Sequence, residues 1–252
     1  MIRSTWRQFR MAVALLTRVP VAYPEDASDE DVGPSAACYP IVGALVGGVA
    51  LVAYYASAAV WDGRALPFVV ALVVWIAVTG GLHVDGLMDA CDGLLSHRSR
   101  DDKLRIMKDP RVGAFGALGL AALLLLKLGA LTALPKDRVW WAILLAPVIG
   151  RLSMVYAGAA FAYARPEGGM GGSFAAQTRW RHFAVAGALT LAAVAAVGEL
   201  RAWVCLAVVA VCVWWVARRI ARSLGGMTGD TYGALCEVTE LVALMAFGAA
   251  IA

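Results

Sequence analysis

The sequence predicts an all-α integral membrane protein, a polytopic helical bundle of about seven transmembrane helices plus a short N-terminal interfacial or buried helix. Three observations predict this class. Of the 252 residues, 61% are hydrophobic and only 16% are charged, whereas soluble domains carry about 45–50% apolar and about 25% charged residues. The 26 glycines suit helices that pack closely in lipid. Long apolar runs recur along the chain.

The apolar runs locate the helices. Crossing the hydrocarbon core takes about 20 apolar residues. The fifth and sixth candidates are short, so we expect them to tilt against neighbours or to be partly covered by protein. No long linker separates the runs, which predicts one membrane domain over residues 1–252. The candidate spans are residues 34–60, 66–82, 113–134, 139–160, 183–197, 202–217 and 233–252.

The N-terminus has a basic start and an apolar stretch but does not resemble a cleaved signal. Arg18 follows soon after the apolar residues and no small-residue cleavage site appears, so we expect this segment to be retained. Its apolar run, residues 11–16, is too short to span. An interfacial helix or a buried core segment is therefore predicted.

Charge and cysteine content exclude other classes. The formal net charge of +4 is too small to indicate a polyanion, so we expect no nucleic acid partner. The five cysteines are an odd number without a C-x-x-C pair, which indicates neither a disulfide framework nor a zinc site. The lipid bilayer is the expected surrounding, and the sequence leaves open whether the chain forms a homo-oligomer.

The distribution of Lys and Arg predicts the orientation. With a cytoplasmic N-terminus, 17 of the 22 basic residues lie on the cytoplasmic side, Arg151 counted among them, 4 lie opposite, and Lys127 is inside a span. Cytoplasmic loops are enriched in Lys and Arg. The cytoplasmic connections, 83–112, 161–182 and 218–232, are also long and rich in Gly, Asp and Arg. We expect a multi-pass protein of the cell (inner) membrane with its active site facing the cytoplasm.

Three carboxylates follow the second predicted span, in the segment GGLHVDGLMDACDG. Asp85, Asp89 and Asp92 are spaced by four and three residues, which places them on one helical face. Like charges one turn apart destabilise a helix, and a divalent cation would remove that conflict. Hard oxygen ligands suit Mg²⁺ or Mn²⁺. The triad predicts a site for a divalent cation, Mg²⁺ or Mn²⁺, and the alternative is a solvated acidic helix end.

Six basic residues follow the triad in residues 96–116. Arg side chains match phosphate oxygens as planar forks, and Lys supplies a point charge. Beside three carboxylates, this group indicates a metal and cations that hold a diphosphate. Lys108 and Arg111 are the predicted phosphate contacts. The alternative, for any one of them, is contact with lipid headgroups.

A second polar group lies in LGGMTGDTYGALCEVTE, residues 224–240. Asp230, Glu237 and Glu240 bring carboxylates to the start of the last span, where ionisable groups are costly. Ionisable residues inside such an apolar run are functional by default, so these carboxylates are candidate site residues. A helix N-terminus that favours acidic residues explains Asp230 well, Glu237 in part and Glu240 poorly.

Two further features accompany these groups. His83, two residues before Asp85, is a candidate base or substrate ligand, and a packed histidine is the equal alternative. The Gly-rich stretch 164–174 either covers a ligand or is a plain flexible linker.

At these residues the sequence resembles the cobalamin synthase, or adenosylcobinamide-GDP ribazoletransferase, family. The resemblance covers nearly the whole chain and includes H-x-D-G-x-x-D-x-x-D-G followed by GGxTGD. It departs from the family pattern at Pro110 and Cys236. The similar segments are ALLTRVPV at 14–21, YPIVGALVGG at 39–48, GGLHVDGLMDACDG at 80–93, IMKDPRVGAFG at 106–116 and GGMTGDTYGALCEVTE at 225–240.

The resemblance implies a transfer that joins adenosylcobinamide-GDP to α-ribazole, or its 5′-phosphate, giving adenosylcobalamin, or its phosphate, and GMP. It further implies that Asp85, Asp89 and Asp92 hold one or two Mg²⁺ ions, with Asp92 as a candidate acceptor of the ribazole hydroxyl proton. Lys108 and Arg111 would stabilise the leaving GMP. Asp230 and Glu237 would complete the ion shell or orient ribazole, and so bind substrate.

Two other functions compete. CDP-alcohol phosphatidyltransferases also cluster aspartates at the cytoplasmic face, but their D-G-x-x-A-R pattern fails here because no Arg follows Ala90. A cation transporter would line a path with acidic residues, usually near the midplane of two related halves. The carboxylates here are predicted at the inner edge, and no internal repeat is apparent.

Overall fold

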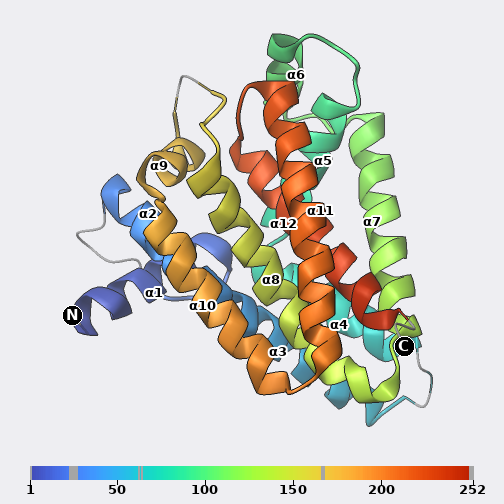
Figure 1. Ribbon diagram of the computed structural model, residues 1–252. Helices are drawn as coiled ribbons and strands as arrows, with labels where there is room; N and C mark the ends of the chain where they lie inside the picture. Colours follow the sequence, from blue (N-terminus) through green and yellow to red (C-terminus); the bar gives the residue numbers. More distant parts are fainter. Residues whose placement is uncertain (1, 23–27, 62, 64, 166–167, 250–252) are drawn as a thin grey trace.

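The computed structural model is a bundle of helices (Figure 1) and describes residues 2–22, 28–61, 63, 65–165 and 168–249. Within these ranges there is no β-strand, and a lone bridge joins Tyr163 to Met227. The predicted all-α class is confirmed. In chain order the α-helices are α1 Ile2–Leu16, α2 Val32–Ser35, α3 Tyr39–Ala58, α4 Ala65–Thr79, α5 Leu82–Leu94, α6 Arg100–Ile106, α7 Ala114–Ala133, α8 Val139–Ala160, α9 Met170–Gln177, α10 Trp180–Val197, α11 Leu200–Leu224 and α12 Gly229–Gly248.

The long helices are those of a multi-pass membrane protein. Six helical stretches are long and apolar enough to cross a membrane, and a bent pair, α4 with α5, makes a seventh when it is counted as one span. In the spans of α8 and α12, 78% and 67% of the residues are buried, against 22% in α7, α10 and α11. Leu118, Leu125 and Val211 are each about two-thirds exposed. Outer helices with such apolar surfaces need lipid around them.

Small residues set the closest packing in the centre. Gly43 and Gly47, one turn apart on α3, face α8 so closely that a Cβ at Gly43 would lie 2.4 Å from the Pro147 carbonyl oxygen. At Gly47 the corresponding atom would lie 2.7 Å from the Ile143 carbonyl oxygen. Glycine pairs of this spacing let two helix backbones meet in lipid.

The second predicted span, 66–82, is wrong at its end. α4 stops at Thr79, because Gly80 and Gly81 adopt φ values of 63° and 72°. α5 then leaves at 88° to α4. Two successive glycines enter the left-handed region without a Cβ clash. α4 has 15 residues, too few to cross alone. The aspartate triad therefore lies on the second half of a broken or re-entrant segment.

Other boundaries also differ from the predictions. α11 continues to Leu224 instead of ending at residue 217, and α12 begins at Gly229 instead of residue 233. Asp230 is therefore in the first turn of α12. Arg151, counted with the cytoplasmic residues, is fully buried inside α8. Residues 250–252 of the last predicted span, and Arg64 of the charge count, lie outside the described residues.

The N-terminal helix α1 is amphipathic. Met11, Ala12 and Val13 are almost fully buried, whereas Trp6 is 59% exposed. The run 11–16 therefore packs into the bundle, as the buried-segment alternative predicted, while the start of the helix stays at the surface.

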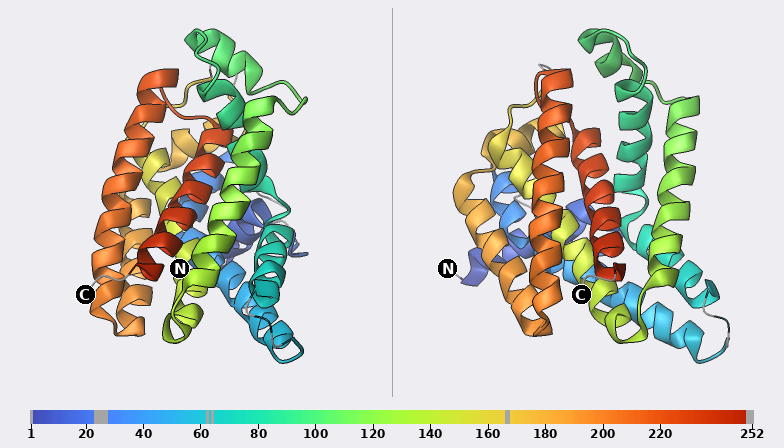
Figure 2. Two further views of the ribbon diagram at one scale, coloured as in Figure 1. Left: turned by 90° about the vertical axis from the view of Figure 1, so that its right-hand side faces the viewer. Right: turned by 45° about the vertical axis from the view of Figure 1, so that its right-hand side comes forward.

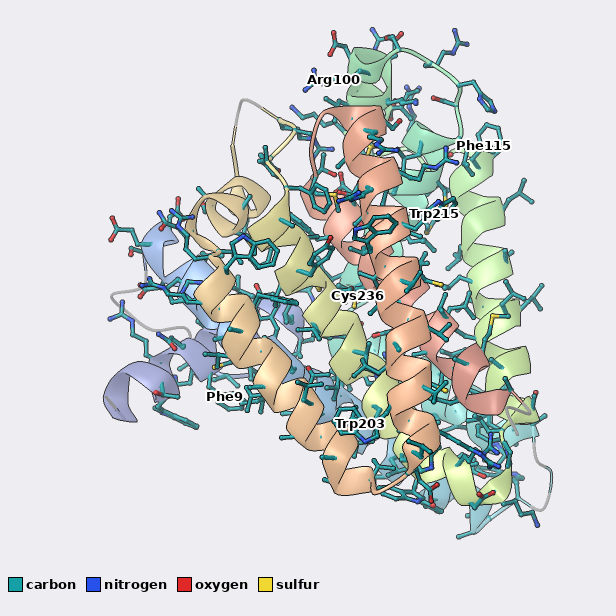
Figure 3. All side chains as sticks on the ribbon, viewed as in Figure 1. Phe9, Arg100, Phe115, Trp203, Trp215 and Cys236 are labelled. Atoms are coloured by element: carbon teal, nitrogen blue, oxygen red, sulfur yellow. The ribbon has the colours of Figure 1, made fainter. Side chains whose placement is uncertain are left out.

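The connections gather at two opposite ends. Figure 1 and both views of Figure 2 place α6, the start of α7, the end of α11 and the start of α12 at one end. The turns between α3 and α4, α7 and α8, and α10 and α11 lie at the other end. Figure 3 shows Arg100 at the α6 end, with Trp215 nearer to it along α11 than Trp203. The polar connections from α5 through α6 to α7 and from α11 to α12 thus share one end of the bundle.

Candidate active site

The site is built where α5 crosses α12. A Cβ at Gly86 of α5 would lie 2.8 Å from the Asp230 carbonyl oxygen, and one at Gly233 of α12 would lie 3.1 Å from the His83 Cα. Neither helix could come this close with a larger residue at these positions. The crossing therefore sets Asp230 against the helix that carries the triad.

Four carboxylates lie around this crossing, close enough to influence one another by charge. The Asp89 carboxylate is repelled by those of Asp230, Asp85 and Asp92, and it is attracted by the Arg165 guanidinium. Asp85 is exposed, and the other three are partly buried. The structure thus brings the predicted Asp230 to the predicted triad. Sequence reasoning missed Arg165, because its partner is 65 residues away.

The start of α12 is fixed by its own sequence. Thr228 caps the helix: its hydroxyl accepts from the Thr231 N–H at 3.2 Å, and the Thr231 hydroxyl accepts from the Thr228 N–H at 2.7 Å. This is a capping box. Asp230 follows in the first turn, where the helix dipole favours a negative charge.

The glycine pair before this cap brings Arg165 to Asp230. Gly225 and Gly226 have φ values of 72° and 156°, and a Cβ at Gly226 would lie 2.4 Å from the Ala162 carbonyl oxygen. Met227 N–H donates to that oxygen at 2.8 Å, and Ala164 N–H donates back to the Met227 carbonyl at 2.8 Å. The next residue, Arg165, donates through Nη2 to Asp230 Oδ2 at 2.7 Å.

Asp92 has a structural task as well as its place in the triad. Its Oδ2 accepts from the Gly113 N–H and its Oδ1 from the Gly116 N–H, both at 2.8 Å. Gly113 is the N-cap of α7, so the carboxylate satisfies amide groups that would otherwise lack partners. Both Asp92 oxygens are therefore engaged with α7.

The carboxylate group suits a hard cation by its chemistry. Asp85, Asp89, Asp92 and Asp230 offer only oxygen donors, and the Arg165 guanidinium offsets part of the repulsion that Asp89 experiences. Such donor sets favour Mg²⁺. Among the described residues, no three His, Cys, Asp or Glu side chains are already gathered at metal-binding distances. The aspartate side chains at the crossing would have to rotate for their oxygens to surround one ion.

The two predicted phosphate contacts lie on the exposed connection between α6 and α7. Lys108 is exposed. The Arg111 side chain is 86% exposed and binds Asp109 through Nε at 2.9 Å and Nη2 at 2.6 Å. These hydrogen bonds lower the pKa of Asp109 to about 2. Arg111 is two residues before Gly113 and so lies near Asp92, while its guanidinium is held by Asp109 at the surface.

Two other basic residues of this connection hold the fold. Arg100 donates through Nε to the Leu224 carbonyl at 2.7 Å and through Nη2 to the Ala164 carbonyl at 2.9 Å. Lys103 donates to the Ser223 hydroxyl at 2.8 Å. They tie α6 to the C-terminal end of α11, where a cation complements the helix dipole.

A cavity of about 280 Å³ opens beside the carboxylates. Asp85 and Asp230 line it together with apolar and aromatic residues from α1, α3, α8, α9 and α12. The described part of the Gly-rich stretch includes the start of α9, whose Met170, Gly171 and Phe174 line the cavity; residues 166–167 lie outside the described residues. That this stretch covers a ligand stays a prediction. His83 lines the cavity but is 1% exposed, and its Nδ1 lies 3.4 Å from Arg151 Nη2.

Glu237 is not brought to this cavity. Lys127 of α7 donates to Glu237 at 2.6 Å and to Glu240 at 2.5 Å, and Arg151 of α8 also pairs with Glu240. All four side chains are at least 96% buried. Buried charges are costly unless they are paired. Here two cations neutralise two anions inside the bundle. The predicted substrate role of Glu237 is replaced by this buried ion network, which the sequence did not reveal because its members are up to 113 residues apart.

Comparison with known proteins agrees with the motifs. Residues 8–248 match the family described as Cobalamin-5-phosphate synthase. The chain is similar to the adenosylcobinamide-GDP ribazoletransferase of Roseiflexus sp. (strain RS-1), with 41% identity over 96% of this chain and 90% of that protein. It is 40% identical to the protein of the same name from Desulforamulus reducens, over 92% of each chain.

A third ribazoletransferase, from Herpetosiphon aurantiacus, is 38% identical over 95% of each chain. No solved structure matches this chain. The full-length agreement sets aside the phosphatidyltransferase and transporter alternatives. The chain belongs to the cobalamin-5-phosphate synthase family, whose members include the adenosylcobinamide-GDP ribazoletransferases.

Proposed function

We propose that this protein transfers the adenosylcobinamide phosphate group of adenosylcobinamide-GDP to α-ribazole, or to its 5′-phosphate, and releases GMP. Family membership supports the reaction. The observation that supports the position of the site is the crossing of α5 and α12, which sets Asp85 and Asp230 beside a cavity. The location we propose is the cytoplasmic face of the cell inner membrane, and the basic residues of the connections at this end of the bundle support it.

In this reaction a ribazole hydroxyl oxygen forms a bond to the phosphorus that bears the cobinamide. The bond from that phosphorus to the bridging oxygen breaks, and GMP departs with the electron pair. The hydroxyl proton passes to a carboxylate oxygen. Asp85, which lines the cavity, is better placed for this than Asp92, whose oxygens already accept from the α7 backbone. The protein positions the two substrates and stabilises the negative charge on the phosphates, as in other phosphoryl transfers.

Mg²⁺ would be held by Asp89, by one oxygen of Asp85 and by the second lone pair that each Asp92 oxygen keeps, with Asp230 across the helix crossing. The other Asp85 oxygen would then accept the hydroxyl proton. Bound there, Mg²⁺ would neutralise charge on the diphosphate. Arg165 keeps Asp230 in place through its 2.7 Å hydrogen bond. Lys108 and Arg111 lie on the connection that leads to the α7 N-terminus. They would bind the phosphate of the leaving GMP after Arg111 releases Asp109.

The direct test uses the purified full chain in lipid vesicles with adenosylcobinamide-GDP and α-ribazole, with and without Mg²⁺. The expected result is metal-dependent release of GMP and formation of adenosylcobalamin in equal amounts. Folded, metal-supplied protein that releases no GMP would contradict the proposal.

Substitutions at the carboxylates locate the site. Asp85→Asn and Asp89→Asn should each lower turnover by roughly 100-fold or more, the scale seen when one group that stabilises transition-state charge is lost. Asp137→Asn is the matched control, because Asp137 is exposed at the opposite end of the bundle. Full activity in both triad variants would remove the metal role from Asp85 and Asp89.

A further inference from the structure

The cavity beside the carboxylates has an aromatic wall. The Phe174 ring of α9 stacks on Tyr39 of α3, with ring centroids 5.6 Å apart and planes 8° apart. Tyr232 of α12 meets Phe174 edge-on, with centroids 5.0 Å apart and planes 72° apart. All three residues line the cavity, and all three are at most 5% exposed. The wall is therefore rigid and assembled from three helices.

Two polar atoms in this wall lack partners. His83 Nε2 and the Tyr232 hydroxyl are buried and have no hydrogen-bond partner in the described part of the protein. Both residues line the cavity. Buried polar atoms are nearly always hydrogen-bonded, so an unpaired one calls for an explanation. Two in one cavity wall indicate a ligand, and the Tyr232 hydroxyl calls for a hydrogen-bond acceptor on it.

The size of the cavity limits what it can hold. An engineered apolar cavity of roughly 150 Å³ accepts a benzene ring. A cavity of about 280 Å³ therefore has room for two fused rings. Leu15, Leu16 and Met154 make its remaining wall largely apolar, which would leave the several polar edge atoms of guanine without partners.

We propose that this cavity binds the base of the acceptor, the fused dimethylbenzimidazole ring of ribazole, and so selects the acceptor. This inference rests on the proposed function. The apolar rings fill the space beside Phe174 and Tyr39, and the Tyr232 hydroxyl donates to the one free ring nitrogen. The ribose then extends toward Asp85 and Asp230 at the polar end, where its hydroxyl meets the phosphorus.

Phe174→Leu tests the aromatic wall while it keeps most of the apolar volume, so the variant should fold. We expect the KM for α-ribazole to rise roughly two- to tenfold, the scale of a lost aromatic contact, with kcat and the KM for adenosylcobinamide-GDP unchanged. Phe183→Leu is the matched control, because Phe183 lines a different cavity, between α8, α10 and α11. A rise in the donor KM alone would assign the cavity to guanine instead and overturn the proposal.

Tyr232→Phe tests the hydrogen bond, and the hydroxyl it removes has no partner within the described residues. The KM for α-ribazole should rise several-fold. A riboside of dimethylindole, in which carbon replaces the free ring nitrogen, should bind wild type and Tyr232→Phe equally. If both compounds lose affinity equally, or neither does, the hydroxyl does not bind the ring nitrogen and the assignment fails.

Binding separates this inference from the proposed function. Calorimetric titration of wild-type protein in lipid with α-ribazole alone, without donor or metal, should show binding that Phe174→Leu weakens. Such binding with no GMP release would contradict the proposed reaction and keep the cavity assignment. GMP release with an α-ribazole affinity insensitive to Phe174 and Tyr232 would contradict the cavity assignment and keep the reaction.

Discussion

Gly86 of α5 lies against the backbone of Asp230 of α12, so closely that a Cβ at Gly86 would be 2.8 Å from the Asp230 carbonyl oxygen. This contact is what places Asp230 opposite Asp85 and Asp89, which a wider helix spacing would separate.

Gly86→Ala should therefore reduce GMP release by at least about tenfold, because catalytic geometry tolerates displacements of only about half an ångström. GMP release measures the loss of activity, and thermal unfolding in detergent measures any accompanying loss of stability. Gly129→Ala on α7 is the control, since a Cβ there has nothing within 4 Å, and it should keep full activity and gain a little stability. Wild-type turnover by Gly86→Ala would show that the crossing distance does not govern the site.

Asp92→Asn should destabilise α7 more than Asp85→Asn or Asp89→Asn does. An asparagine offers one oxygen to the two N–H groups of Gly113 and Gly116, and a lost cap costs about 1 kcal/mol. Chemical denaturation against wild type and Asp101→Asn, whose side chain is 88% exposed, measures this. Unchanged stability would show that these two hydrogen bonds do not hold α7, and abolished turnover would then assign Asp92 to the reaction alone.

Lys127→Met should destabilise the protein by about 3–5 kcal/mol, because it leaves excess negative charge buried at Glu237 and Glu240. The double variant Lys127→Met/Glu237→Gln restores charge balance, with Arg151 still facing Glu240, and should recover most of the loss. Thermal unfolding in detergent follows both, and Lys136→Met, at an exposed position, is the control. A double variant as unstable as the single one would show that charge balance is not what Lys127 supplies.

Arg111→Ala should raise the KM for adenosylcobinamide-GDP without changing the melting temperature. The Arg111 side chain is 86% exposed, and an exposed ion pair contributes little to stability. The pKa of Asp109, lowered to about 2, keeps this pair ionised through the neutral range, so the effect should not vary with pH there. Arg105→Ala removes the equivalent exposed pair with Asp102 and should leave the KM unchanged.

The membrane class, the helical elements and the family were predictable from the sequence alone. Composition and the length of apolar runs reflect the solvent around the protein. They can be read without knowing which helices contact one another. The spacing of Asp85, Asp89 and Asp92 likewise places them on one face without knowledge of any neighbour. The break at Gly80 and Gly81 was visible as two glycines, although their left-handed conformation was not.

Which side chains pair with one another was decided by the tertiary structure. Glu237 pairs with Lys127 from 110 residues away, Asp92 caps α7, and Arg165 holds Asp230. The cavity wall combines Tyr39, Phe174 and Tyr232 from three separate helices. Which helices touch is set by glycine contacts between backbones, and helical periodicity says which face is apolar but not which helix it meets. A buried charge finds its counter-ion, and a cavity its walls, only once the bundle has packed.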